Sequence, residues 1–214
     1  VFRSGTTEVL NKLRTEFSAG APQPDLVLLA DAVTMEALKK EGHLMAMKNV
    51  DVSGIPEQFY DKDKHYIGTK VITSGIVVNT KAKFRPTSWK DLLNPDLKNQ
   101  VAMPSPLYSG AAAISLGAWL ADASLGGWSY VEGLKANGAI AVRGNGAVLQ
   151  QVANGEKAAG ILVDFMALNA KAKGSPVDFV IPKEGLTFVT EPVAVLKTAK
   201  NVPAAEAFVK FLLS

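Results

Sequence analysis

Apolar and polar positions along this chain follow patterns whose period changes from segment to segment. Near the start, a Ser-Gly-Thr-Thr turn precedes apolar residues at helical spacing, which predicts an amphipathic helix with Ser4 or Thr6 as its N-cap. Residues 25–30 then form a continuous apolar run, which predicts a buried parallel strand, and a helix follows over residues 35–41. This strand–helix rhythm is typical of a three-layer α/β lobe.

From residue 89 onward, strands and helices alternate almost without interruption. The apolar runs predict strands over residues 100–103, 139–142, 159–163 and 177–181. The segments between them predict helices over residues 110–121, 128–136, 146–154 and 165–173. A closing helix begins at Pro203, whose ring suits a first helical turn.

Two long extended segments, residues 66–79 and 187–196, bracket this second run. Thr73, near the middle of the first segment, is a candidate ligand-binding residue. The pattern predicts two three-layer αβα lobes joined by two hinge crossovers. Lobe 1 is expected to comprise residues 1–75 and 191–214, and lobe 2 residues 76–190. A cleft between two such lobes is a favoured place for a small ligand.

The composition of the chain limits the classes of partner and site that it can have. The 214 residues carry a formal net charge of only +3, with the charges interspersed, which argues against nucleic acid as a partner. The absence of cysteine excludes thiolate metal sites, disulfides and cysteine nucleophiles. No apolar run is long enough to cross a bilayer and no signal peptide is visible. Both ends of the chain look cut, so we expect it to be the middle of a longer protein.

The strongest candidate site is the strand-to-helix turn that contains Ser109, Gly110 and Ala111. Such a turn presents unpaired backbone N–H groups, a hydroxyl and the positive end of a helix dipole, which together suit a phosphate-like anion. Small residues allow a close approach, and Ser105 adds a second hydroxyl. The simpler interpretation is an ordinary helix N-cap.

Two further turns have a similar character. Residues 143–146 (Arg-Gly-Asn-Gly) place Asn145 and an arginine at another strand-to-helix junction, although turn chemistry alone explains this composition. Thr6 and Thr7 form a third such junction, in the other lobe.

Asp31 and Asp164 each follow a predicted strand, where ligands sit in open α/β sheets. If either faces the cleft it would suit a cationic group, but helix capping explains both equally well. Tyr108 is a candidate pocket wall. His43 and His65 are expected to be surface residues, because two histidines without cysteine form no recognisable metal cluster.

No catalytic triad, metal-ligand spacing or P-loop is present. The chain therefore looks like a binding protein and not an enzyme, with no cofactor and no metal. An enzyme acting on a phosphorylated substrate and a ligand-sensing module of a regulator remain as alternatives.

Several of these segments resemble the type II (family 1) extracytoplasmic solute-binding proteins of ABC importers, in the group that binds ferric ion, thiamine or phosphonate. The resemblance covers nearly the whole chain and runs through residues 4–10, 73–80, 87–93, 103–112, 144–156 and 190–196. It is strongest to the 2-aminoethylphosphonate-binding proteins, through residues 103–112 and 161–166. It implies a periplasmic-binding-protein type II fold, a periplasmic or extracytoplasmic location, a monomer, and an ABC permease as partner.

The resemblance also implies roles for individual residues. The positions of the iron-ligating tyrosines of ferric-ion binders are Phe165 and Met166 here, which do not suit a hard metal ion. The positions that hold the anion are retained in this chain: Ser109, Gly110, Ala111 and Asn145.

We therefore expect a small anionic or zwitterionic ligand, 2-aminoethylphosphonate, with its phosphonate on these four residues. Ser105, Thr6 and Thr7 would assist, Asp31 or Asp164 would read the ammonium, and Tyr108 would form a wall. The same fold with another ligand stays open: ferric ion with an anion, a phosphorylated metabolite, a sulfonate or an amine.

Overall fold

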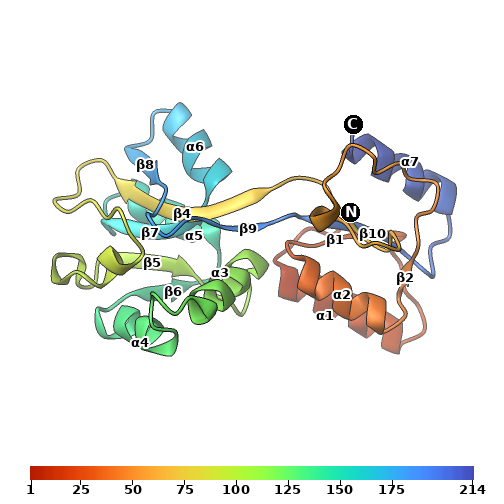
Figure 1. The fold of residues 1–214 in the computed structure, drawn as a ribbon, viewed down its shortest axis with the longest axis horizontal. Helices are drawn as coiled ribbons and strands as arrows, with labels where there is room; N and C mark the ends of the chain where they lie inside the picture. The colour runs from red at the N-terminus through yellow and green to blue at the C-terminus, as the bar shows by residue number, and fades with distance from the viewer. The chain divides into compact units, whose positions relative to one another are not determined.

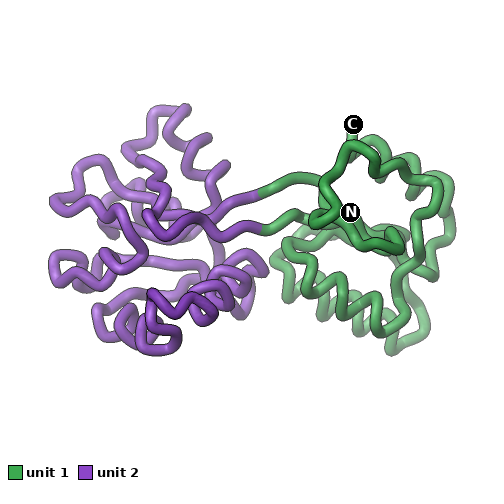
Figure 2. Tube along the Cα trace, in the orientation of Figure 1, with its two compact units in different colours: residues 1–71, 189–214 green, residues 72–188 purple.

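A computed structural model describes all residues from 1 to 214. The chain forms two compact units (Figure 2). Unit 1 comprises Val1–Val71 and Val189–Ser214, and unit 2 comprises Ile72–Phe188. The chain therefore passes from one unit to the other twice, within the two extended segments that the sequence analysis singled out.

Unit 1 contains the following elements: α1 (Thr6–Ser18), β1 (Leu26–Leu28), α2 (Ala32–Lys40), β2 (Leu44–Met45), η1 (Glu57–Phe59), β3 (Ile67–Gly68), β10 (Pro192–Leu196) and α7 (Val202–Leu212). Its sheet has β10 at the centre, and β1, β2 and β3 all pair with it antiparallel. Alternate residues of β10 face opposite sides of the sheet: one side packs on α1 and α2, and the other on α7. Unit 1 is thus a three-layer unit.

The expected parallel strand at residues 25–30 is wrong in its pairing. It is β1, which runs antiparallel to β10, and its Leu28 is 37% exposed. A continuous apolar run signals a strand near a core, but it carries no information on the direction of the neighbouring strand.

The N-cap of α1 also differs from the expectation, because it is Gly5 and not Ser4 or Thr6. The Ser4 hydroxyl donates instead to the carboxylate of Glu8, one turn into the helix. No side chain caps the start of α1.

Unit 2 contains the following elements: β4 (Ile72–Asn79), η2 (Lys90–Leu93), η3 (Pro95–Leu97), β5 (Val101–Pro104), α3 (Gly110–Ala121), α4 (Trp128–Ala136), β6 (Ile140–Val142), α5 (Asn145–Ala153), β7 (Ala159–Val163), α6 (Asp164–Ala172), β8 (Val177–Val180) and β9 (Thr187–Val189, whose last residue belongs to unit 1). The predicted helices and strands from residue 100 onward agree with these bounds to within one residue at each end.

The sheet of unit 2 has the order β6-β5-β7-β4-β8, with β9 beside β4. Strands β5, β6 and β7 are mutually parallel, whereas β4 is antiparallel to β7 and β8. Helices α3 and α4 pack on one face of the sheet, and α5 and α6 pack on the other. The three-layer αβα architecture predicted for each lobe is therefore confirmed.

No helix of the chain is both long and apolar enough to serve as a membrane span.

Candidate functional site

Three helices of unit 2 begin at one edge of its sheet. The parallel register pairs Pro104 at the end of β5 with Val142 at the end of β6, and β7 runs parallel on the other side of β5. Each of these strands leads into a helix of nine residues or more: β5 into α3, β6 into α5 and β7 directly into α6 (Figure 1). The positive ends of three helix dipoles therefore meet at this edge, which favours negative charge there.

Ser105 organises the turn between β5 and α3. Its N–H donates to the carbonyl of Val142 (2.7 Å), and its own carbonyl accepts from the N–H groups of Tyr108 (3.1 Å) and Ser109 (3.0 Å). Its hydroxyl oxygen accepts from the N–H of Leu107 (3.3 Å) and is buried. Ser105 thus shapes the turn, and its hydroxyl hydrogen has no acceptor within the chain.

Ser109 is the N-cap of α3, because its hydroxyl oxygen accepts from the N–H of Ala112 (3.3 Å). The next two N–H groups, those of Gly110 and Ala111, have no hydrogen-bond partner in the chain. Both residues are buried, so bulk water reaches these donors poorly. Unpaired buried donors at a helix start are what an anion ligand would satisfy.

Asn145 is the first residue of α5, and Gly144 before it is the N-cap. The carbonyl of Gly144 accepts from the N–H groups of Ala147 (3.2 Å) and Val148 (3.4 Å), and no side chain caps this helix. The amide side chain of Asn145 is partly exposed and forms no hydrogen bond within the chain. It is therefore a second donor available at the same edge.

Tyr108 and Arg143 connect these two turns. The guanidinium carbon of Arg143 lies 5.8 Å from the centroid of the Tyr108 ring, within the range of a cation–π interaction. The tyrosine is 42% exposed. The sequence singled out both residues but gave no sign that they touch.

Asp164 and Thr73 also meet at this edge. One carboxylate oxygen of Asp164 accepts from the hydroxyl (2.6 Å) and the N–H (3.2 Å) of Thr73 at the start of β4. The other accepts from the N–H of Phe165 (2.6 Å). Both oxygens are therefore already engaged, which the sequence did not indicate because the partners are 91 residues apart.

The remaining predicted site residues belong to unit 1. Asp31 is the N-cap of α2, accepts from the N–H (2.7 Å) and hydroxyl (3.1 Å) of Thr34, and is only 5% exposed. Its geometry is that of a helix cap. Thr6 and Thr7 form the first turn of α1 and are partly exposed.

The structure thus gathers eight of the eleven candidates at one edge of unit 2, and these are Thr73, Ser105, Tyr108, Ser109, Gly110, Ala111, Asn145 and Asp164.

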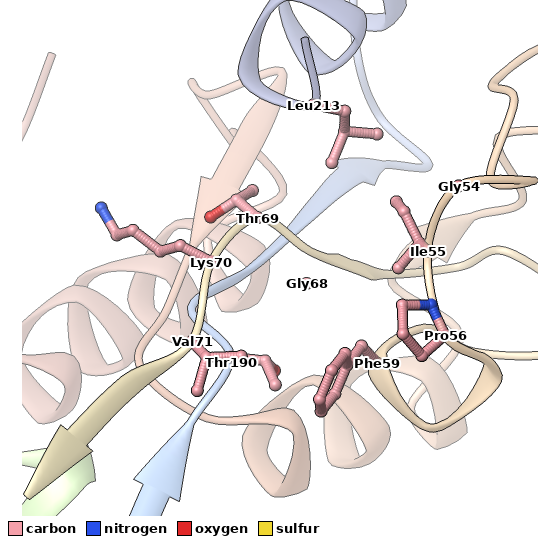
Figure 3. Close-up of a pocket in the computed structure, with 10 residues that line it drawn as sticks. All are labelled: Gly54, Ile55, Pro56, Phe59, Gly68, Thr69, Lys70, Val71, Thr190 and Leu213. Atoms are coloured by element: carbon pink, nitrogen blue, oxygen red, sulfur yellow. The ribbon is translucent and has the colours of Figure 1, made fainter.

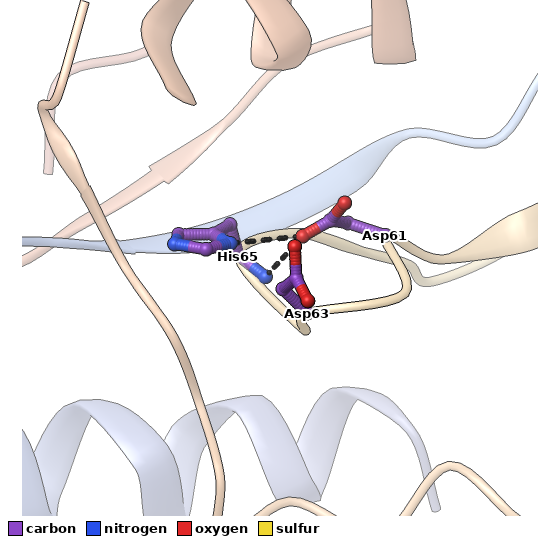
Figure 4. A group of neighbouring side chains, drawn as sticks. All are labelled: Asp61, Asp63 and His65. Carbon is purple, nitrogen blue, oxygen red and sulfur yellow. Dashed lines mark hydrogen bonds and ion pairs between the residues drawn. The ribbon is translucent and has the colours of Figure 1, made fainter. Parts of the chain in front are cut away.

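A cluster of charged groups in unit 1 has contacts that the sequence did not indicate. The metal-ligating atoms of Asp61, Asp63 and His65 lie within 4.8 Å of one another. Figure 4 shows these three side chains side by side. The ammonium of Lys39 already lies between the carboxylates, 2.6 Å from Asp61 and 3.3 Å from Asp63. Burial would raise the pKa of Asp61, but hydrogen bonds from Lys39 and His65 outweigh it and lower that pKa to about 2. The cluster is an ion-pair network in which Asp61 is buried, Lys39 and His65 are partly buried and Asp63 is exposed.

The two histidines are not free surface residues, contrary to the expectation. The Nδ1 atom of His65 lies 2.9 Å from a carboxylate oxygen of Asp61, and the ring of His43 stacks on Phe17 at a centroid distance of 3.9 Å. Both are partly buried because tertiary contacts cover them.

Unit 1 also contains a hollow of about 170 Å³ beside the linking segments (Figure 3). Its lining is mainly apolar, with Ile55, Pro56, Phe59 and Leu213 around Gly68. The ammonium of Lys70 points away from it. Apart from Thr69 and Thr190, no polar side chain is directed into it, so it offers a small anion no cationic group.

Comparison with known proteins agrees with this architecture. Residues 21–214 match the family described as bacterial extracellular solute-binding protein. An uncharacterized protein of Haemophilus influenzae is 28% identical over 99% of this chain, and the chain spans 64% of that relative's length.

Two solved structures show the same fold. The periplasmic binding protein AfuA from Actinobacillus pleuropneumoniae, with fructose-6-phosphate bound, has a TM-score of 0.86 and 26% identity. The match covers 100% of this chain and 70% of AfuA. Iron-bound HitA from Pseudomonas aeruginosa has a TM-score of 0.80 at 23% identity, over 99% of this chain and 71% of HitA.

The family match covers nine-tenths of the chain, and both units have the layered α/β architecture of these structures. The chain belongs to the family of bacterial extracellular solute-binding proteins.

Proposed function

We propose that this chain captures a small phosphonate, 2-aminoethylphosphonate, outside the cytoplasm and delivers it to an ABC permease without performing chemistry on it. The phosphonate oxygens would accept hydrogen bonds at the sheet edge of unit 2 where α3, α5 and α6 begin. We refer to Ser105, Ser109, Gly110, Ala111 and Asn145 as the anion cradle. The protein would work as a monomer in the periplasm.

The observation that supports this proposal best is the set of unused donors in the cradle. The N–H groups of Gly110 and Ala111 and the amide of Asn145 have no partner within the chain. They belong to the starts of two helices that follow adjacent parallel strands. A phosphonate group has three oxygens that would satisfy donors arranged in this way.

Magnitudes are consistent with binding alone. Hydrogen bonds to a charged group contribute about 1.5–3 kcal/mol each. A helix N-terminus adds about 0.3–2 kcal/mol. After the costs of ordering and desolvation, four such bonds with two helix ends would leave roughly the 8 kcal/mol of micromolar affinity.

The structurally similar AfuA supports a ligand of the phosphate type, because its structure holds fructose-6-phosphate. Iron fits this chain less well. Phe165 and Met166 stand at the start of α6, where the resemblance implies iron-ligating tyrosines, and neither offers an oxygen ligand. HitA, which binds iron, is similar in fold.

For the ammonium end of the ligand, Asp164 is the better of the two predicted carboxylates. It lies at the same edge of unit 2 as the cradle, and a carboxylate has about four acceptor positions, of which three are used. Asp31 is a buried helix cap in unit 1.

Calorimetry on the full-length protein tests this proposal, with 2-aminoethylphosphonate, inorganic phosphate, phosphoserine and ferric citrate as separate titrants. We expect micromolar or tighter binding of 2-aminoethylphosphonate and weaker binding of phosphate and phosphoserine. Tight binding of iron alone, or no binding of any phosphorus compound, would overturn the ligand assignment.

A further inference from the structure

Arg143 occupies an unusual position among the exposed cations of unit 2. It precedes Gly144, the N-cap of α5, while Tyr108 precedes Ser109, the N-cap of α3. Their side chains meet at 5.8 Å, so the arginine of one helix start rests on the ring of the other. The guanidinium is thereby placed at the edge where both sets of backbone donors begin.

The ring contact limits the rotamer freedom of the exposed Arg143 side chain. A long arginine side chain loses considerable rotamer entropy when a ligand orders it, and stacking on an aromatic face reduces that loss in advance.

We propose that Arg143, positioned by the ring of Tyr108, selects ligands by charge and favours a dianionic phosphonate or phosphate ester over a monoanionic sulfonate. This inference rests on the proposed function and names the ligand class that the same cradle prefers.

Backbone donors alone discriminate poorly between the two classes. Phosphonate and sulfonate groups are both tetrahedral and both present three oxygens to N–H donors. They differ in charge, because a phosphate-type group carries about −1.5 to −2 at pH 7 whereas a sulfonate carries a single charge. A fixed guanidinium distinguishes them, since its attraction grows with the charge on the ligand and is strengthened by bidentate hydrogen bonds.

The test uses an isosteric pair of ligands, 2-aminoethylphosphonate and 2-aminoethanesulfonate (taurine). Calorimetry at pH 7.5 on the full-length protein measures the ratio of their affinities in the wild type, Arg143→Gln, Tyr108→Ala and Tyr108→Phe. We expect the wild type to prefer the phosphonate. Arg143→Gln should reduce the affinity ratio about fivefold to tenfold, mainly by weakening phosphonate binding.

The two tyrosine variants test the positioning role. Tyr108→Ala should reduce the ratio by a smaller factor, about twofold to fivefold, because the guanidinium keeps its charge but loses its support. Tyr108→Phe keeps the ring and should restore the preference. If Tyr108→Phe lowers the ratio as much as Tyr108→Ala does, the ring is not what positions Arg143.

Arg85→Gln is the matched control for net charge. Arg85 lies in the same unit and pairs with Asp178 (2.9 Å) near the opposite end of β4. Its replacement should leave the ratio unchanged, and a reduction equal to that of Arg143→Gln would show a general charge effect and overturn the inference.

The remaining outcomes separate this inference from the proposed function. If the wild type binds the phosphonate but Arg143→Gln keeps its ratio, or if the wild type binds both ligands equally, the charge selection by Arg143 is wrong and the cradle stands. If the wild type binds neither ligand, the proposed function fails and the inference fails with it.

Discussion

At the scale of single residues, Ser109 and the two residues after it have different roles at the start of α3. The Ser109 hydroxyl satisfies the N–H of Ala112, and the N–H groups of Gly110 and Ala111 stay unpaired. The helix cap and the anion cradle are therefore built from one turn. The sequence left two interpretations open for this turn, an ordinary helix N-cap and an anion-binding site. The two are compatible in the structure.

Ser109→Leu should abolish measurable binding of 2-aminoethylphosphonate, because a bulky side chain would cover the unpaired donors. Ser109→Ala should cost about 1 kcal/mol of unfolding free energy through loss of the cap. Calorimetry and urea unfolding measure the two effects. Asn201→Ala is the matched control, since Asn201 caps α7 in unit 1 by accepting from the N–H of Ala204 (3.1 Å). It should lose similar stability and keep full affinity; full affinity in Ser109→Leu would refute the cradle.

Asn145→Ala should weaken 2-aminoethylphosphonate binding about tenfold or more, because a hydrogen bond to a charged group is worth about 1.5–3 kcal/mol. Its thermal stability should change little, since the Asn145 amide has no partner within the chain. Asn137→Ala provides the contrast: the Asn137 amide donates to the carbonyls of Leu92 and Asn94, both at 3.0 Å. That variant should lose stability and keep its affinity. Unchanged affinity in Asn145→Ala would remove Asn145 from the site.

At the scale of elements, the position of α5 depends on a close approach to the sheet. Gly160 on β7 faces this helix, and a Cβ atom there would lie 2.6 Å from a methyl carbon of Val148 and 3.0 Å from the carbonyl oxygen of Ala102. Only glycine allows α5 to lie this close, and α5 carries Asn145 at its start. The packing of α5 against the sheet therefore sets the position of Asn145.

Gly160→Ala should destabilise the protein by about 1–3 kcal/mol, because the added carbon overpacks the contact between α5 and β7. Ligand affinity should fall as well, since Asn145 moves with the helix. Gly117→Ala is the control: Gly117 is inside α3 and a Cβ atom there would meet nothing within 4 Å, so helix propensity should stabilise the variant by about 0.5–1 kcal/mol. Chemical unfolding measures both, and a neutral Gly160→Ala would contradict the packing argument.

The elements themselves were largely predictable. From residue 100 onward their bounds agree with the hydrophobic pattern, because periodicity and turn residues are local properties of the chain. The antiparallel direction of β1 and the N-cap residue of α1 were not predictable from the sequence. The first depends on a partner strand more than 150 residues away, and the second on a competing hydrogen bond from Ser4 to Glu8.

At the scale of the whole molecule, stability should depend on pH through the network around Asp61. The pKa of Asp61 is lowered from 3.8 to about 2. A carboxyl group whose pKa is depressed on folding stabilises the protein above its unfolded pKa, and this contribution disappears as the pH falls through the folded value. The contribution is therefore present at pH 6 and is lost between about pH 4 and pH 2.

Asp61→Asn should lower the unfolding free energy by about 2 kcal/mol at pH 6, and the difference from the wild type should shrink towards pH 2. Urea unfolding at pH 6, 4, 3 and 2 measures this convergence. Asp63→Asn is the matched control. Asp63 pairs with the same Lys39 ammonium, but it is exposed and the distance is longer, 3.3 Å against 2.6 Å for Asp61. Asp63→Asn should lower the unfolding free energy much less than Asp61→Asn does. If the difference in unfolding free energy between Asp61→Asn and the wild type stays constant from pH 6 to pH 2, the ionic contribution of Asp61 is ruled out.

The sequence by itself determined the alternation of strands and helices, the layered architecture of both units and the small, hydroxyl-rich turns at helix starts. These features follow from periodicity and turn chemistry, which act over a few residues. Tertiary structure alone decided which turns meet. Strand order places the starts of α3, α5 and α6 at one edge and brings Thr73 to Asp164 and Arg143 to Tyr108. Those outcomes depend on strand pairing between distant segments, and no local pattern encodes the direction or neighbour of a strand.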